Sequence, residues 1–152
     1  MAAKDDKESQ LMKKSSVLTK KVYKHYRGMM EDFINDDQNV NHDDFATKIA
    51  DAMEDPKKLG LTIPSEDVEQ CFFPIIQSGG EYDLKVNASS SSKKLSHDVI
   101  IASIGARYQS YCSSMSRTYL IDPCKKMETT YQTLVELQEV RERSVLFVML
   151  LM

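Results

Sequence analysis

The sequence predicts an α+β fold made of two N-terminal helices, a small, mostly antiparallel sheet and a C-terminal helix. Apolar residues repeat at helical spacing through residues 4–54, short strand-like runs occupy residues 65–122, and helical spacing returns over residues 123–152. Helices and strands that are segregated along the chain in this way are typical of α+β proteins. With 152 residues, the chain is expected to form a single domain.

Apolar stripes predict the two helices of residues 4–54. The first helix is expected over Lys4–Ile34 and the second from the N-cap Asn41 to about Glu54. The inward face of the first helix is formed by Leu11, Leu18, Val22, Tyr26, Met29 and Phe33. The lysines beside that stripe are Lys13, Lys14, Lys20, Lys21 and Lys24. Because acidic residues surround these lysines, a solvated face is favoured over a functional basic patch.

Five short runs rich in β-branched and aromatic residues are predicted to be strands. They are Cys71–Gln77, Tyr82–Val86, Val99–Ile104, Arg107–Cys112 and Ser116–Ile121. Turns are expected at Gly79-Gly80 and Gly105-Ala106, and a loop over Ser89–Ser92. The third helix is expected to use Asp122 as its N-cap and Pro123 as its first residue. Its apolar side is formed by Met127, Tyr131, Leu134 and Leu137 or Gln138.

The chain ends in the apolar run VLFVMLLM, residues Val145–Met152. A membrane-spanning helix needs about 20 apolar residues, so this run predicts no membrane anchor. Two interpretations are open, the end of a core helix and an aberrant terminus, and the second is slightly favoured.

Composition excludes some functions. The net charge of −3 and the pI of about 5.6 indicate no basic surface of the kind that neutralises the phosphates of DNA, so we expect no direct DNA binding. The three cysteines, Cys71, Cys112 and Cys124, lie far apart without a metal-ligand spacing. They are expected to be reduced thiols, which fits a cytosolic or nuclear compartment.

The segment Val99–Asp122 carries the clearest functional signal. It reads VIIASIGARYQSYCSSMSRTYLID and resembles the pattern D-x-G-x-x-Y-x-x-Y-x-S-D-x-x-R-T of the creatinase and methionine aminopeptidase superfamily, which has the pita-bread fold. In that superfamily both aspartates bind a pair of divalent metals, but here the two positions are Ser103 and Ser114. Neutral hydroxyls are poor ligands for two cations roughly 3.5–4 Å apart. The resemblance therefore implies vestigial ligand positions and no cofactor.

Four further segments point to one family within this superfamily. They are KHYRGMMEDFIND, CFFPIIQSGGEYDLK, SYCSSMSRTYLIDP and YQTLVELQE, in this order within Lys4–Glu139. Together they resemble the N-terminal peptidase-like domain of the large subunit of FACT, the nuclear histone chaperone. The resemblance implies a partial pita-bread domain, because the family's remaining ligands, a His and two Glu, lie beyond residue 152. Val86 stands at about the position of the substrate-side histidine of active relatives.

The same resemblance implies a non-catalytic module that takes part in nucleosome reorganisation during transcription elongation, DNA replication and DNA repair. Histones and the smaller FACT subunit are the expected partners, through the parent protein, and the nucleus and chromosome are the expected location. No small-molecule substrate is expected. Two alternatives stay open: an active metallo-aminopeptidase or prolidase, which Ser103 and Ser114 disfavour, and a truncated fragment without function.

A disused peptidase cleft could still bind an extended peptide or a histone tail. The candidate residues for that cleft are Tyr108, Tyr111 and Arg117, with the rim formed by Gln77–Tyr82. Strand packing of the tyrosines and an internal salt bridge of Arg117 are the favoured alternatives. Neither motif serine has the sequence surroundings of a nucleophile. The histidines His25, His42 and His97 are assigned to the surface or to helix caps.

Overall fold

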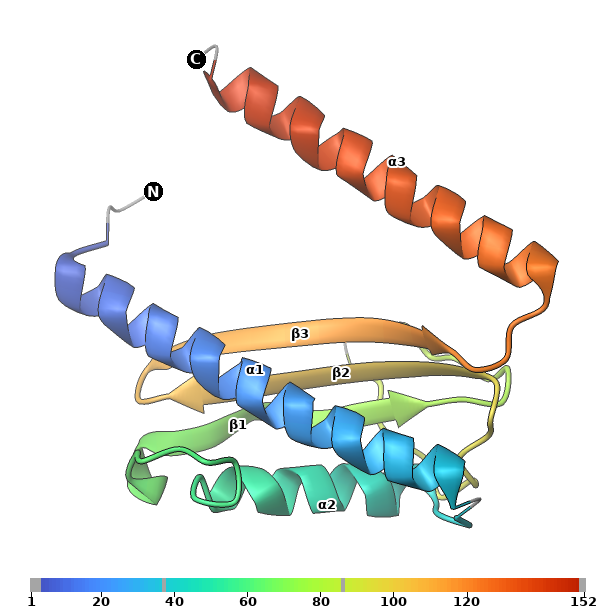
Figure 1. Ribbon diagram of the computed structural model, residues 1–152. Helices are drawn as coiled ribbons and strands as arrows, with labels where there is room; N and C mark the ends of the chain where they lie inside the picture. The colour runs from blue at the N-terminus through green and yellow to red at the C-terminus, as the bar shows by residue number, and fades with distance from the viewer. Residues whose placement is uncertain (1–3, 37, 86, 151–152) are drawn as a thin grey trace. The chain divides into compact units, whose positions relative to one another are not determined.

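The computed structural model describes residues 4–36, 38–85 and 87–150 (Figure 1), with side chains up to residue 140. The chain divides into two compact units, Met1–Tyr119 and Leu120–Met152, which we describe separately. The elements in order are α1 (Asp6–Asn35), α2 (His42–Glu54), the short 3-10 helix Ser65–Asp67, β1 (Val68–Gln77), β2 (Val99–Tyr108), β3 (Tyr111–Leu120) and α3 (Lys125–Leu150). This order confirms the predicted α+β class.

Helix α1 begins with a capping box. The side chain of Asp5 accepts the N–H of Glu8 at 2.7 Å, and the Glu8 carboxylate accepts the N–H of Asp5 at 2.9 Å. These two bonds satisfy backbone donors that the first turn of a helix leaves unpaired. Four residues of the predicted apolar stripe, Leu18, Val22, Tyr26 and Phe33, are at most 1% exposed. Leu11 and Met29 are only half-buried, and Met30, beside the stripe, is buried instead of Met29.

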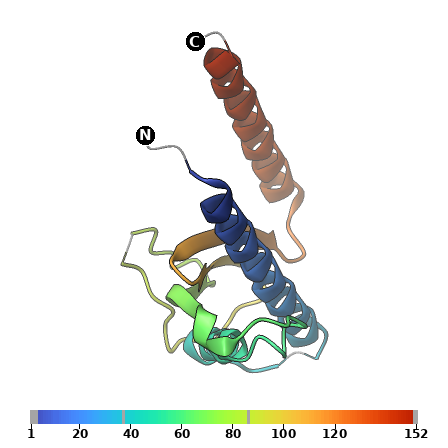
Figure 2. The same ribbon diagram turned by 90° about the vertical axis from the view of Figure 1, so that its left-hand side faces the viewer.

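Figures 1 and 2 show α1 lying across one face of the sheet. Hydroxyl groups at four-residue spacing fix it there: Ser15 donates to Ala106 O at 3.1 Å, Thr19 to Ser113 O at 3.0 Å and Tyr23 to Ala102 O at 3.2 Å. The spacing of four keeps these groups on one side of the helix.

Helix α2 covers the same face of the sheet beside β1. The ring of Phe45 on α2 lies edge-on to Tyr26 and Phe33 of α1, with centroids 5.9 and 6.3 Å apart. Asn41 precedes the helix with an extended backbone, as predicted for an N-cap. Its side chain makes no cap bond and instead donates to the carboxylate of Asp44 at 3.2 Å.

The sheet has three strands in the order β1-β2-β3, and β1 pairs with β2 in antiparallel register from Val68↔Tyr108 to Gln77↔Ile101. Two of the strand predictions are wrong. Arg107–Cys112 is not one strand, because Arg107 and Tyr108 end β2, residues 109–110 form the turn, and Tyr111 and Cys112 begin β3; the described part of Tyr82–Val86 is not a strand. Val99–Ile104 lies within β2, which continues to Tyr108.

The turn between β2 and β3 lies at residues 109–110, where Gln109 adopts a left-handed φ of 53°. The predicted turn at Gly105-Ala106 is therefore wrong, because Gly105 lies inside β2 opposite Phe72. A Cβ atom at Gly105 would stand 2.6 Å from Cε1 of the Phe72 ring. Close packing thus accounts for the glycine. The predicted turn at Gly79-Gly80 is confirmed, and both residues have positive φ.

Helix α3 belongs to the second unit and begins at Lys125. The prediction of Asp122 as N-cap and Pro123 as first helical residue is wrong by two positions. Asp122 has φ 48°, and the first helical bond runs from Glu128 N–H to Cys124 O at 3.1 Å. The side chains of the apolar tail at 145–152 lie outside the part that is described. Among the described helices, none is long and apolar enough to cross a membrane.

Candidate functional site

The two vestigial ligand positions lie on the face of the sheet that α1 does not cover. On β2 the side chains alternate, and Ile104 and Ala106 are fully buried toward α1 while Ser103 points the other way. Ser103 Oγ lies 2.8 Å from Ser116 Oγ of β3. Ser114 is exposed and, two residues from Ser116 along β3, shares its face. The structure therefore brings Ser103 and Ser114 to adjacent strands of one surface.

This surface does not fit a two-metal centre. Its polar groups at the motif positions are neutral hydroxyls, which lack the negative charge that a pair of divalent cations requires. Within residues 4–36, 38–85 and 87–150, no group of three or more His, Cys, Asp or Glu side chains is placed to hold a metal ion. We derive no metal-dependent chemistry for it.

The candidate cleft residues lie on the opposite, α1-covered face. Tyr108 is only 5% exposed, and Lys14 Nζ stands 5.3 Å from the centre of its ring. Tyr111 donates its hydroxyl to Glu8 at 2.6 Å, a bond that raises the pKa of Tyr111 to about 12. Both tyrosines thus contact α1, and neither lies on the face of the sheet that carries Ser103.

Arg117 is exposed, and it donates to the backbone oxygen of Ser116 at 2.9 Å. It lies with Met115 and Tyr119 in a groove beside α1, again on the face opposite Ser103. Among the described residues, no carboxylate lies within salt-bridge distance of its guanidinium, in contrast to the internal salt bridge considered from the sequence.

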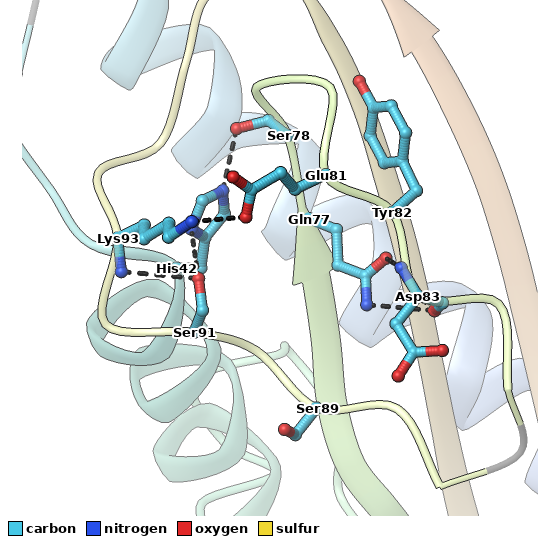
Figure 3. Close-up of a pocket in the computed structure, with 9 residues that line it drawn as sticks. All are labelled: His42, Gln77, Ser78, Glu81, Tyr82, Asp83, Ser89, Ser91 and Lys93. Carbon is cyan, nitrogen blue, oxygen red and sulfur yellow. Dashed lines mark hydrogen bonds and ion pairs between the residues drawn. The ribbon is translucent and has the colours of Figure 1, made fainter.

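A pocket that was not predicted from the sequence forms around His42 (Figure 3). The pocket has a volume of about 330 Å³ and is lined by His42, Gln77, Ser78, Glu81, Tyr82, Asp83, Ser89, Ser91 and Lys93. Four residues of the predicted rim Gln77–Tyr82 line it, namely Gln77, Ser78, Glu81 and Tyr82, but the pocket is not lined by any of the candidate cleft residues.

The sequence predicts His42 at the surface or in a helix cap. It is the first residue of α2, directly after the N-cap Asn41, but it is only 3% exposed, so the surface alternative is wrong. Its Nε2 atom lies 2.8 Å from Ser78 Oγ and its Nδ1 atom 3.2 Å from Ser91 Oγ. Ser78 Oγ also accepts the N–H of Ser96 at 2.7 Å. Burial lowers the pKa of His42, which favours the neutral imidazole.

These bonds tie the long connection between β1 and β2 to the start of α2. The His42 N–H donates to Lys93 O at 3.0 Å, and Lys93 forms an ion pair with Glu81 at the pocket mouth. A serine in contact with a histidine resembles a nucleophile and its base, but the other ring nitrogen here faces a second serine instead of an orienting carboxylate. The arrangement therefore serves to hold the loop in place.

The other titratable candidates have structural environments. The ring of His97 packs against Phe33 with centroids 4.5 Å apart. The cysteines Cys71, Cys112 and Cys124 are free thiols, as predicted. Burial raises the pKa of Cys71 to about 11, which disfavours a reactive thiolate.

Comparison with known proteins gives consistent results. The model of metallopeptidase family M24 matches residues 10–145. FACT complex subunit SPT16 of Oryza sativa subsp. japonica is 39% identical over 142 residues, and that of Dictyostelium discoideum is 38% identical over 139 residues; each match covers 91% of this chain.

Two solved structures share the fold. The N-terminal domain of FACT complex subunit SPT16 from Cicer arietinum superposes with a TM-score of 0.86 at 34% identity, and that from Eremothecium gossypii with a TM-score of 0.82 at 30% identity. Each covers 91% of this chain, but this chain spans only 33% and 34% of those two chains. It spans 13% of the length of the two SPT16 subunits named above.

Proposed function

We propose that this chain, which belongs to metallopeptidase family M24, acts as a non-catalytic binding module of a FACT-type histone chaperone. Its similarity to the N-terminal domain of SPT16 over 91% of its length supports the chaperone assignment. Ser103 and Ser114 stand where the superfamily motif has its two metal-binding aspartates, and this supports a non-catalytic role.

One observation carries this proposal: Ser103 and Ser114 sit on adjacent strands, on the sheet face that α1 leaves uncovered. The Ser103 hydroxyl is hydrogen-bonded to Ser116, and neither motif serine can supply the negative charge of an aspartate. A surface of this kind offers hydroxyl and backbone groups to a ligand but cannot activate water through metals. We therefore infer that this surface binds a protein ligand and does not catalyse a reaction.

The proposed ligands are histones, and the proposed setting is the nucleus and the chromosome. The module would act within a longer parent protein that also engages the smaller FACT subunit, in nucleosome reorganisation during transcription elongation, DNA replication and DNA repair. Of the three cleft candidates, Arg117 alone has an exposed side chain, since Tyr108 and Tyr111 are occupied in contacts with α1.

Titration of the purified chain with labelled histone complexes and histone-tail peptides tests this proposal. At about 0.15 M salt we expect saturable binding. Ser114→Lys places a positive charge on the uncovered face and should weaken binding of the basic histone partner, whereas Ser92→Lys, in the exposed loop, should not. Equal effects of the two substitutions, or no binding of any histone species, would contradict the proposal.

A peptidase assay separates this function from the enzymatic alternative. The chain should release no product from proline-containing or methionine-initiated peptides when it is supplied with Mn²⁺, Co²⁺ or Zn²⁺. Metal-dependent hydrolysis by the purified chain, lost on addition of a chelator, would establish the peptidase instead.

A further inference from the structure

A positively charged groove runs between α1 and β3 within the first unit, away from the motif serines and the His42 pocket. It has a volume of about 580 Å³ and is lined by Lys20, Tyr23, Lys24, Arg27, Met115, Arg117 and Tyr119. We call it the α1/β3 groove. Figure 1 shows the two elements that form its walls.

Local geometry explains why these residues meet. Positions 20, 24 and 27 are spaced by four and three, which places Lys20, Lys24 and Arg27 on one stripe of α1. Alternation along β3 places Arg117 on the same face as Met115 and Tyr119, toward α1. The groove therefore combines cations from both walls.

The apolar part of the groove is its floor. Tyr23 is 6% exposed, and Met115 and Tyr119 are half-buried. Tyr119 packs edge-on against Tyr26, with ring centroids 5.8 Å apart, so the floor is held rigidly by the core. A volume of about 580 Å³ is sufficient for one large side chain together with the backbone on either side of it.

The positive charge of the groove is largely uncompensated. Arg27 pairs with Glu31 at 3.4 Å, and within the described residues it is the one groove cation with a carboxylate at salt-bridge distance. Arg117 and Arg27 also act against the rise that burial causes in the pKa of Tyr119. This local excess of positive charge stands on a chain whose net charge is −3. A complementary ligand would have to be anionic.

We propose that the α1/β3 groove binds an acidic peptide segment whose carboxylates pair with Lys20, Lys24 and Arg117 and whose single aromatic or aliphatic side chain enters between Met115 and Tyr119. Carboxylates form strong charge-assisted hydrogen bonds with arginine and lysine. The half-buried Met115 and Tyr119 favour a protein segment over the phosphate backbone of a nucleic acid. The ligand proposed for this groove is acidic, whereas histone tails are basic. The proposal therefore does not depend on histone binding.

Fluorescence anisotropy tests the proposal on the full chain. The probe is a short labelled peptide of Glu and Asp with one central Phe, at about 0.15 M salt. The comparison probes replace Phe by Ser, replace the acids by Lys, or are single-stranded oligothymidylate. We expect the acidic Phe peptide to bind most tightly, the Ser peptide more weakly and the Lys peptide not at all. Binding should weaken as salt is raised.

Matched variants locate the site. Lys24→Gln with Arg117→Gln should weaken binding about three- to tenfold, as expected for the loss of two partly exposed ion pairs. Lys13→Gln with Lys48→Gln removes the same charge from exposed positions outside the groove and should leave binding unchanged. Arg117→Lys keeps the charge and should retain most of the affinity, which distinguishes a lost contact from a lost fold.

Equal weakening by the two double variants would overturn the proposal, because it would show a diffuse effect of net charge. So would absence of binding by the acidic peptide, or equal binding of the Phe and Ser peptides. Tighter binding of oligothymidylate than of the acidic peptide would also overturn it and assign the groove to single-stranded nucleic acid. Failure of histone binding alone would leave it standing.

Discussion

Replacing Gly105 by alanine should destabilise the protein, although alanine is the smallest side chain with a Cβ. The new Cβ would lie 2.6 Å from Cε1 and 3.1 Å from Cζ of the Phe72 ring, and 3.1 Å from Cβ of Cys71. Favourable carbon contacts lie at about 3.5–4.0 Å, so the ring has to move by almost an ångström. Overpacking of this kind costs about 1–3 kcal/mol, and because Phe72 is half-buried and can shift outward, we expect about 1–2 kcal/mol.

Gly28→Ala is the matched control. Gly28 lies within α1, and a Cβ there would meet no atom within 4 Å. The same chemical change should therefore raise the free energy of unfolding by about 0.5–1 kcal/mol, through helix propensity. The two alanine variants should differ by about 2 kcal/mol.

Urea unfolding followed by circular dichroism measures both variants. Phe72→Ala combined with Gly105→Ala should cost less than the sum of the single changes, because the shortened side chain no longer clashes. If Gly105→Ala were as favourable as Gly28→Ala, or if the double variant were strictly additive, the close packing of Phe72 on β2 would be refuted.

Two further predictions concern buried polar groups. The Tyr26 hydroxyl is buried without a hydrogen-bond partner in the described part of the chain, so Tyr26→Phe should leave the free energy of unfolding unchanged or raise it by about 1 kcal/mol. Tyr23→Phe loses the hydrogen bond to Ala102 O and should lower the free energy of unfolding by about 1 kcal/mol. Urea unfolding measures both variants. The reverse order would contradict this assignment. Burial lowers the pKa of His42, so the unfolded chain binds more protons between the folded-state pKa and about 6.5. The contribution of His42 to stability is therefore complete above about pH 6.5 and decreases below it, by at most about 1.4 kcal/mol per pH unit. Unfolding at pH 7.5 and 5.5 should show this slope, and His42→Gln should reduce it while His25→Gln should not; an unchanged slope in His42→Gln would refute the assignment.

The helices could be predicted from the sequence because their signals are local. The apolar stripe of α1 and the N-cap position of Asn41 depend only on neighbouring residues, and both predictions are confirmed within two positions. The β2–β3 turn could not be located, because Gln109 adopts a left-handed φ without the Gly or Asn that usually indicates one. Gly105, which does suggest a turn, is explained by a residue 33 positions earlier, Phe72.

The position of the β2–β3 turn also determines which residues can share one site. A turn at Gly105-Ala106 would break the alternation between Ser103 and Tyr108, whereas a continuous strand places two residues five apart on opposite faces. The motif serines were identified from the sequence, but their separation from the candidate cleft residues depends on this register. The burial of His42 depends on Ser78 and Ser91, which lie in a loop that folds back over α2.

Metal binding tests the central claim most directly. The purified chain is dialysed to equilibrium against micromolar Mn²⁺, Co²⁺ or Zn²⁺, and the bound metal is measured by elemental analysis. Because Ser103 and Ser114 provide hydroxyls where carboxylates are needed, we predict no stoichiometric binding of any of the three ions. About two ions retained per chain, the number a binuclear peptidase centre holds, would contradict the account.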